Sequence, residues 1–122
     1  MDINTVIIGG RLTREPEVRY MDSGFAIART AIAVHRTKKK DEDEPKTDFY
    51  DVDAFGKLAE FLEDKGFKGQ RVVIVGRLEN DEYENRDGQR VKKTKIIANN
   101  INVYDWRDRP ADRLPNEEEF KF

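Results

Sequence analysis

The chain has 122 residues, enough for one domain with a single hydrophobic core. Hydrophobic residues make up 37% of the sequence and charged residues 39%, which predicts a small core and a surface rich in charge. The absence of cysteine excludes disulfides and thiolate chemistry. No apolar run approaches membrane-spanning length and the N-terminus lacks the features of a secretory signal, so we expect a cytoplasmic protein with no membrane partner.

The formal net charge of −2 is unevenly distributed along the chain. Residues 1–104 hold 19 Lys and Arg and 19 Asp and Glu, so residues 105–122 contribute the whole imbalance. The neutral body can therefore carry a basic face that suits an anionic partner. An evenly mixed surface is the alternative that composition leaves open.

The first part of the chain predicts a strand over residues 2–12, in which Gly9 and Gly10 indicate a bulge or a sharp bend. Residues 11–19 are too polar to belong to the core, and residues 22–24 have the composition of a turn.

Residues 25–36 form a long run of Ala, Ile, Val and Thr. Its alanines favour a helix, but Ile32 and Val34 alternate with small residues and turns bound the run on both sides, so we predict a strand. Residues 37–46 contain no apolar residue and are predicted to form a charged loop between two long strands.

Residues 47–57 are the most informative strand of the chain. With a period of two, Phe49, Asp51, Asp53 and Phe55 share one face, while the opposite face carries the residues that suit burial, Tyr50, Val52 and Ala54. Two phenyl rings on a solvated face are either covered by another subunit or form a platform for a flat ligand.

Residues 57–65 predict a short amphipathic helix that ends at Gly66, with Phe61 in the core. A strand follows over residues 71–79 and continues as an extended ribbon over 82–85. Asp87-Gly88 predicts a hairpin turn, and residues 90–104 predict the last strand.

The predicted order of three strands, one helix and two strands is typical of an all-β fold, the five-stranded Greek-key OB-fold barrel, with one short helix between strands three and four. We assign residues 1–104 to this domain. Residues 105–122 contain prolines and charges without periodicity and are predicted to form a flexible, disordered acidic tail with a terminal aromatic tip.

Enzymatic chemistry finds little support in the sequence. His35 is the only histidine and Ser23 the only serine, so no nucleophile and base can be paired. Asp51 and Asp53 share a strand face, but two carboxylates are weak evidence for a cation site. We therefore expect a protein without catalysis, cofactor or metal.

Binding of single-stranded nucleic acid fits better, because it needs rings that stack on bases and cations that follow the phosphates. The predicted stacking rings are Phe49, Phe55 and Tyr83. The cations predicted near them are Arg11, Arg14, Arg36, Lys38, Lys57, Arg71, Arg77, Arg90, Lys92 and Lys93.

Several segments, in order and spacing, resemble the bacterial single-stranded DNA-binding proteins (SSB). They are Ile8-Gly9-Gly10-Arg11-Leu12-Thr13, Glu15-Pro16-Glu17-Val18-Arg19-Tyr20, Ser23-Gly24, Asp48-Phe49, Ala54-Phe55-Gly56-Lys57-Leu58-Ala59-Glu60, Val75-Gly76-Arg77-Leu78, Tyr83-Glu84 and Asp87-Gly88.

This resemblance implies a homotetramer of OB-fold subunits, associated with the nucleoid, that coats single-stranded DNA during replication, recombination and repair. Phe49, Phe55 and Tyr83 match positions of base-stacking aromatics in the family. The resemblance also implies an aromatic where this chain has Lys38, and neutral or basic residues where it has Asp51 and Asp53, so we expect local repulsion of phosphates there.

The family usually ends in an acidic tip that recruits replication and repair proteins. The resemblance thus implies a partner-binding tip here, although Lys121 replaces the expected proline; its residues are Glu117, Glu118, Glu119, Phe120 and Phe122. Two alternatives remain for the whole protein. One is an OB-fold RNA-binding or primosome-type accessory protein, and the other is an interaction module in which a partner subunit covers Phe49 and Phe55.

Overall fold

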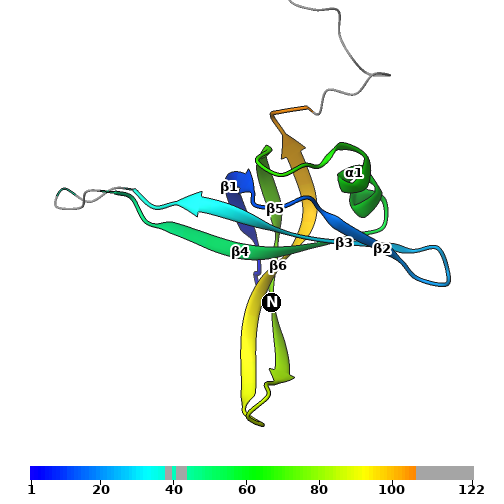
Figure 1. Ribbon diagram of the computed structural model, residues 1–122, viewed down its shortest axis with the longest axis vertical. Helices are drawn as coiled ribbons and strands as arrows, with labels where there is room; N and C mark the ends of the chain where they lie inside the picture. Colours follow the sequence, from blue (N-terminus) through cyan, green and yellow to red (C-terminus); the bar gives the residue numbers. More distant parts are fainter. Residues whose placement is uncertain (38–39, 41–43, 107–122) are drawn as a thin grey trace, which may run out of the picture.

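The computed structural model describes residues 1–37, 40 and 44–106 (Figure 1). Within these residues the chain forms six strands and one helix. They are β1 (Val6–Leu12), β2 (Glu17–Tyr20), β3 (Ala26–His35), β4 (Thr47–Phe55), α1 (Lys57–Lys65), β5 (Arg71–Glu84) and β6 (Arg90–Val103). No helix among the described residues is long and apolar enough to cross a membrane.

The sheet closes on itself to form a barrel. Its strand order is β1-β5-β6-β4-β3-β2, and β1 also pairs with β3 through Arg11 and Ala33. Neighbouring strands are antiparallel except β4 and β6, which pair in parallel at Val52 with Ile96 and at Asp53 with Ile97. β1, β5, β6, β4 and β3 therefore form the predicted five-stranded barrel, and β2 lies outside the ring on the free edge of β3.

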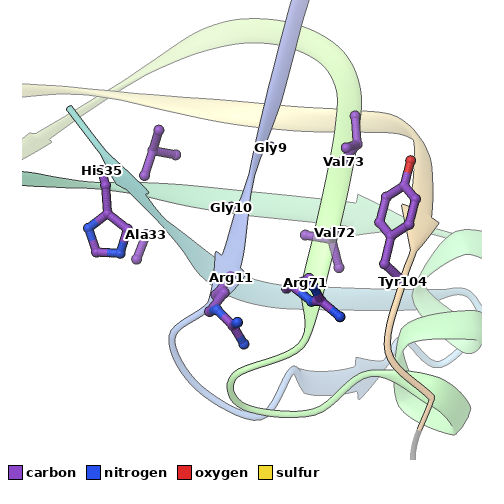
Figure 2. A pocket seen from close by; sticks show the side chains of 10 residues that line it. Gly9, Gly10, Arg11, Ala33, His35, Arg71, Val72, Val73 and Tyr104 are labelled. Carbon is purple, nitrogen blue, oxygen red and sulfur yellow. The ribbon is translucent and has the colours of Figure 1, made fainter. Parts of the chain in front are cut away.

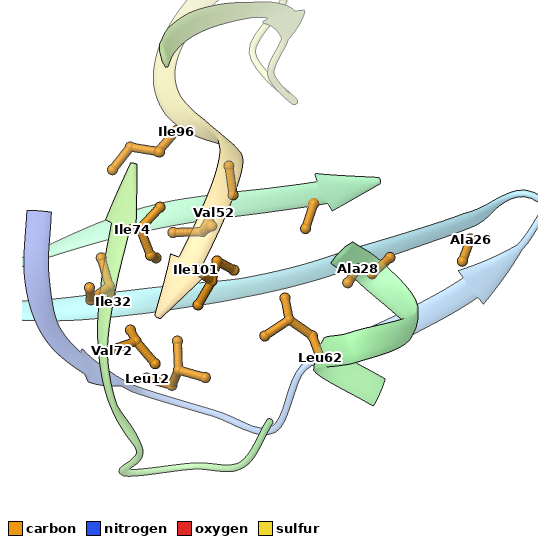
Figure 3. Packing of buried hydrophobic residues seen from close by; sticks show 13 residues of the cluster. Leu12, Ala26, Ala28, Ile32, Val52, Leu62, Val72, Ile74, Ile96 and Ile101 are labelled. Carbon is orange, nitrogen blue, oxygen red and sulfur yellow. The ribbon is translucent and has the colours of Figure 1, made fainter. Parts of the chain in front are cut away.

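The hydrophobic core fills the barrel, and on β4 and β5 it takes alternate residues, Val52 with Ala54 and Val72 with Ile74 (Figure 3). α1 covers one end of the barrel and inserts Leu62, which is completely buried. The remaining large residues of this core come from five strands: Leu12, Ile32, Val52, Val72, Ile74, Ile96 and Ile101.

The five predicted strands and the predicted helix are confirmed, whereas β2 was not expected. Glu17–Tyr20 is exposed apart from the half-buried Val18, because an edge strand needs only its backbone to pair with β3. Its polar composition therefore concealed a strand of the sheet.

Of the two forms predicted at Gly9-Gly10, a bulge or a sharp bend, the bulge is wrong. β1 pairs with β5 in continuous register from Val6 to Arg11. Gly10 is required for a different reason, since a Cβ atom there would lie 2.1 Å from the carbonyl oxygen of Ala33. The missing side chain lets β1 approach β3 closely enough to close the barrel. The register shift of the sheet lies instead between Val75 and Gly76, where β5 pairs with β6.

The β3–β4 and β5–β6 hairpins extend beyond the barrel in different directions (Figure 1). One is the outer half of β3 and β4, where the pairing continues to His35 and Thr47. The other is the outer half of β5 and β6, which ends in a turn with Gly88 at φ +77°. Tyr50 was predicted to be buried but is 39% exposed, because it lies toward the outer half of β4.

Candidate nucleic-acid interface

The three predicted stacking rings are all exposed at the surface. Phe49 and Phe55 are 68% and 37% exposed, and Tyr83 on the β5–β6 hairpin is 50% exposed. Phe49 and Phe55 lie on one face of β4, six residues apart, which corresponds to roughly 20 Å along a strand. The spacing leaves room for nucleotides between the two rings.

The face between the rings is a network of ion pairs. Asp51 accepts a 2.6 Å contact from the Lys93 ammonium group on β6. Asp53 contacts Lys95 at 2.9 Å, and Lys95 also contacts Asp81 on β5 at 2.8 Å. The hydrogen bond that Lys93 donates to Asp51 raises the pKa of Lys93 above its ordinary value.

The position of Asp53 differs from the prediction. The sequence placed it on a solvated face, but it is only 5% exposed because Lys95 and the Arg29 guanidinium, at 3.9 Å, cover it. Lys95 is itself largely buried, and its hydrogen bonds to Asp81 and Asp53 raise its pKa. The carboxylates between the rings are therefore paired with cations. They should repel phosphates less than the two unpaired carboxylates that the sequence predicted.

Most of the predicted cations already have an acidic partner within the chain. Arg36 binds Asp48 through two nitrogens at 2.7 and 3.0 Å, and Arg71 binds Asp105 at 3.0 and 2.8 Å. The weaker pairs are Arg77 with Glu79 at 3.5 Å, Arg90 with Glu82 at 3.6 Å and Lys92 with Glu82 at 3.9 Å. A phosphate that binds these cations must therefore compete with carboxylates.

The other predicted cations have different surroundings. Arg11 donates to the carbonyl oxygen of Gly69 at 3.0 Å, and Arg14 reaches that of Thr30 at 3.5 Å. Lys57, at the start of α1, has neither an ion pair nor a side-chain hydrogen bond to any described residue. Lys38 and the predicted tip from Glu117 to Phe122 lie outside the described residues.

A shallow hollow of about 630 Å³ lies where β1 meets β3 and β5 (Figure 2). Gly9 and Gly10 form part of its lining, and Arg11, Arg71, His35 and Tyr104 surround it. Ala33, which also lines it, pairs directly with Phe49 across β3 and β4. The hollow thus lies beside the strand pair that carries Phe49, and two guanidinium groups, of Arg11 and Arg71, line it.

Residues 105 and 106, predicted as the start of the tail, contact the barrel. Asp105 binds Arg71, and its carbonyl oxygen accepts a 2.7 Å hydrogen bond from the buried amide of Gln70. The hydrogen bonds from Arg71 lower the pKa of Asp105 to about 2. The Trp106 ring meets Phe61 of α1 edge-on, with 6.3 Å between the ring centroids. The boundary at residue 104 stays a prediction.

The sequence did not point to Arg29 and Lys95 as part of this face. Both belong to it because of register, since Arg29 pairs with Asp53 across β3 and β4, and Lys95 immediately precedes Ile96, where the parallel contact of β6 with β4 begins. Alternation along each strand was visible in the sequence, but the pairing of distant strands was not. Among the described residues, no group of three or more His, Cys, Asp or Glu is placed to hold a metal ion.

Comparison with known proteins identifies the family. The model of the single-strand binding protein family matches residues 3–104. The chain belongs to the single-strand binding protein family. Single-stranded DNA-binding protein 1 of Streptococcus pyogenes serotype M18 is 37% identical over 110 residues, which cover 90% of this chain and 85% of that protein.

Two further similarities agree with this assignment to the single-strand binding protein family. Single-stranded DNA-binding protein 1 of Staphylococcus aureus strain Mu50 is 40% identical over 99 residues, which cover 81% of this chain and 64% of that protein. The solved structure described as "Plasmodium falciparum SSB complex with ssDNA" matches with a TM-score of 0.77 at 20% identity, over 86% of this chain and 97% of that one. It confirms the predicted OB-fold.

Proposed function

We propose that this member of the single-strand binding protein family binds single-stranded DNA without sequence preference and without catalysis, and protects it during replication, recombination and repair. The observation that carries the proposal is the pair of exposed rings, Phe49 and Phe55, on one face of β4. Base stacking on such rings needs no base-specific hydrogen bond, because every base has a π-face.

The cations around this face supply the second element of the proposal. Arg11 and Arg71 flank the hollow beside Phe49, and Lys57 begins α1 two residues after Phe55. Phosphates at these positions release counterions, so binding is expected to weaken as salt rises. The named relatives are single-stranded DNA-binding proteins, and the solved neighbour was determined with single-stranded DNA, which supports the same ligand here.

The proposal extends to assembly and location. We place the working form as a homotetramer in the cytoplasm, associated with the nucleoid, in which the residues from Glu117 to Phe122 recruit replication and repair proteins. Removal of the last six residues should reduce recovery of such proteins in a pull-down, and equal recovery would contradict recruitment through the tip.

The primary test is a titration of oligo-dT at two salt concentrations on a sample of measured mass. Phe49→Ala should weaken binding roughly 5- to 150-fold, the equivalent of about 1–3 kcal/mol for one stacked base. Phe49 is exposed, so the variant should keep its thermal midpoint. Comparable affinity for duplex DNA of the same sequence would refute the proposal.

Two alternatives have distinct outcomes in the same experiments. Tighter binding of RNA than of DNA of the same sequence would favour an OB-fold RNA-binding or primosome-type accessory protein. If Phe49 and Phe55 instead contact a partner subunit, their alanine variants should change the mass of the oligomer while leaving oligonucleotide binding intact.

A further inference from the structure

A fourth ring lies beside the predicted stacking rings. Phe25, which immediately precedes β3, is 45% exposed, and its ring lies nearly parallel to that of Phe55. The two ring planes differ by 14° and the centroids are 6.3 Å apart. The aromatic surface at this end of β4 is therefore formed by two rings from different segments of the chain.

The position of Phe25 is fixed by its turn and by the junction between β4 and α1. The backbone N–H of Met21 donates to the carbonyl oxygen of Phe25 at 2.9 Å, and Gly24, at φ +88°, donates to that of Met21 at 2.8 Å. On the other side, a Cβ atom at Gly56 would lie 3.4 Å from the Phe25 ring. The ring thus packs beside the backbone that joins β4 to α1 and is preorganised for contact with a ligand.

Next to these rings lies a hollow of about 330 Å³ over the edge of the sheet. Ile27 belongs to its lining and pairs with Phe55 on one side and with Arg19 on the other. Met21, 54% exposed, adds apolar surface. The hollow is therefore continuous with the Phe55 end of the candidate interface.

The charges of the hollow favour an anionic chain over an apolar partner. Arg19 and Arg29 line it together with a single carboxylate, Glu17, which Arg19 holds at 3.0 Å. Arg29 is 65% exposed in its side chain and contacts Asp53 only at 3.9 Å, so its guanidinium can donate hydrogen bonds to a phosphate. A flat apolar surface can stack on the base of a nucleotide, and the guanidinium groups at its border can bind the phosphate.

We propose that Phe25 and the hollow over Ile27 form a further base-binding subsite, which takes the nucleotide beyond Phe55 in the bound strand. The base stacks on the Phe25 ring and contacts Met21, and Arg29 binds the adjoining phosphate. This subsite rests on the proposed function, since it extends the same single-stranded DNA from β4 toward β2.

The first test compares Phe25→Ala with Leu78→Ala in oligo-dT titrations of the full chain. Leu78 is a matched control, because it is 46% exposed and lies on β5 outside the hollow. Phe25→Ala should weaken binding about fivefold or more, as expected for a lost stacking contact, and Leu78→Ala should stay within about twofold of the wild type. Both variants need an unchanged oligomer mass and thermal midpoint.

A second variant keeps the test decisive if Phe25→Ala does not fold. Phe25→Trp retains an aromatic ring, and DNA should quench the added indole beyond the change seen in wild-type protein, whose one tryptophan is Trp106. Saturation with oligo-dT without extra quenching would overturn the subsite. A change in oligomer mass with unchanged DNA binding would also overturn it and would identify the patch as a contact between copies of the chain.

Failure of the subsite and failure of the proposed function give different results. If Phe49→Ala weakens binding while Phe25→Ala does not, the chain binds single-stranded DNA but the strand does not extend over Ile27. If wild-type protein does not prefer single-stranded oligo-dT to duplex, both proposals are wrong.

Discussion

Asp51→Asn should strengthen DNA binding, although it removes an ion pair. The Asp51 carboxylate contacts Lys93 at 2.6 Å between the predicted stacking rings. A phosphate that approaches Lys93 must displace this carboxylate, which is tethered to the same surface and opposes DNA by its charge. Asparagine leaves the ammonium group available and removes the repulsion.

The magnitude follows from the exposure of the pair. The side chains of Lys93 and Asp51 are 59% and 32% exposed, so water and salt screen their attraction, and an exposed pair of this kind contributes about 0.2–1 kcal/mol. One added phosphate contact should make the slope of log K against log salt steeper by about 0.7. The same slope corresponds to about two- to fivefold tighter binding near physiological salt.

The assay is an oligo-dT titration at four or more salt concentrations. Asp64→Asn is the matched control, because it removes one carboxylate that pairs with a lysine on α1, where Lys65 lies 3.6 Å away. The control should leave the slope unchanged, and the double variant Asp51→Asn with Lys93→Gln should lose the gain. An unchanged slope together with weaker binding in Asp51→Asn would refute the competition between carboxylate and phosphate.

Two further predictions concern stability. Gly10→Ala should destabilise the protein by about 1–3 kcal/mol in chemical denaturation, because its Cβ would lie 2.1 Å from the Ala33 carbonyl oxygen. Gly9→Ala is the control and should lose less stability, because the nearest atom to its Cβ would lie at 3.4 Å. Equal losses of stability in the two variants would contradict the close approach of β1 to β3. The pKa of Asp105 is depressed to about 2 in the folded chain, so its contribution to stability is complete above the unfolded pKa of about 3.9 and is lost as pH falls through 2. The difference in thermal midpoint between wild type and Asp105→Asn should therefore shrink between about pH 4 and pH 2, and a difference that is constant with pH would show that Arg71 does not stabilise the charge.

The sequence predicted the elements that have their own periodicity or turn chemistry. α1 was predicted with its observed bounds, since Leu58 and Leu62 lie at helical spacing before Gly66. β3 was predicted despite its alanines because alternation and flanking turns outweighed helix propensity. β2 lacked any such pattern, since its pairing with β3 is made by the backbone of an edge strand.

The candidate interface likewise has a part that could be predicted from the sequence and a part that could not. The exposed rings on β4 follow from alternation within one strand, so Phe49 and Phe55 could be identified from the sequence. The burial of Asp53 could not, because it depends on Arg29 and Lys95 from two other strands. Register between distant strands is set by the whole barrel, and no local pattern contains it.

The short parallel contact between β4 and β6 is a place where the barrel can open locally. Two residue pairs, Val52 with Ile96 and Asp53 with Ile97, join these strands. Lys95 contacts Asp53 across these two strands at 2.9 Å on the face between the predicted stacking rings, whereas Val52 and Ile96 belong to the core. Amide hydrogen exchange at these residue pairs should therefore report both local opening of the barrel and DNA binding. A DNA strand bound across β4 and β6 would hold the two β-strands together and slow the exchange.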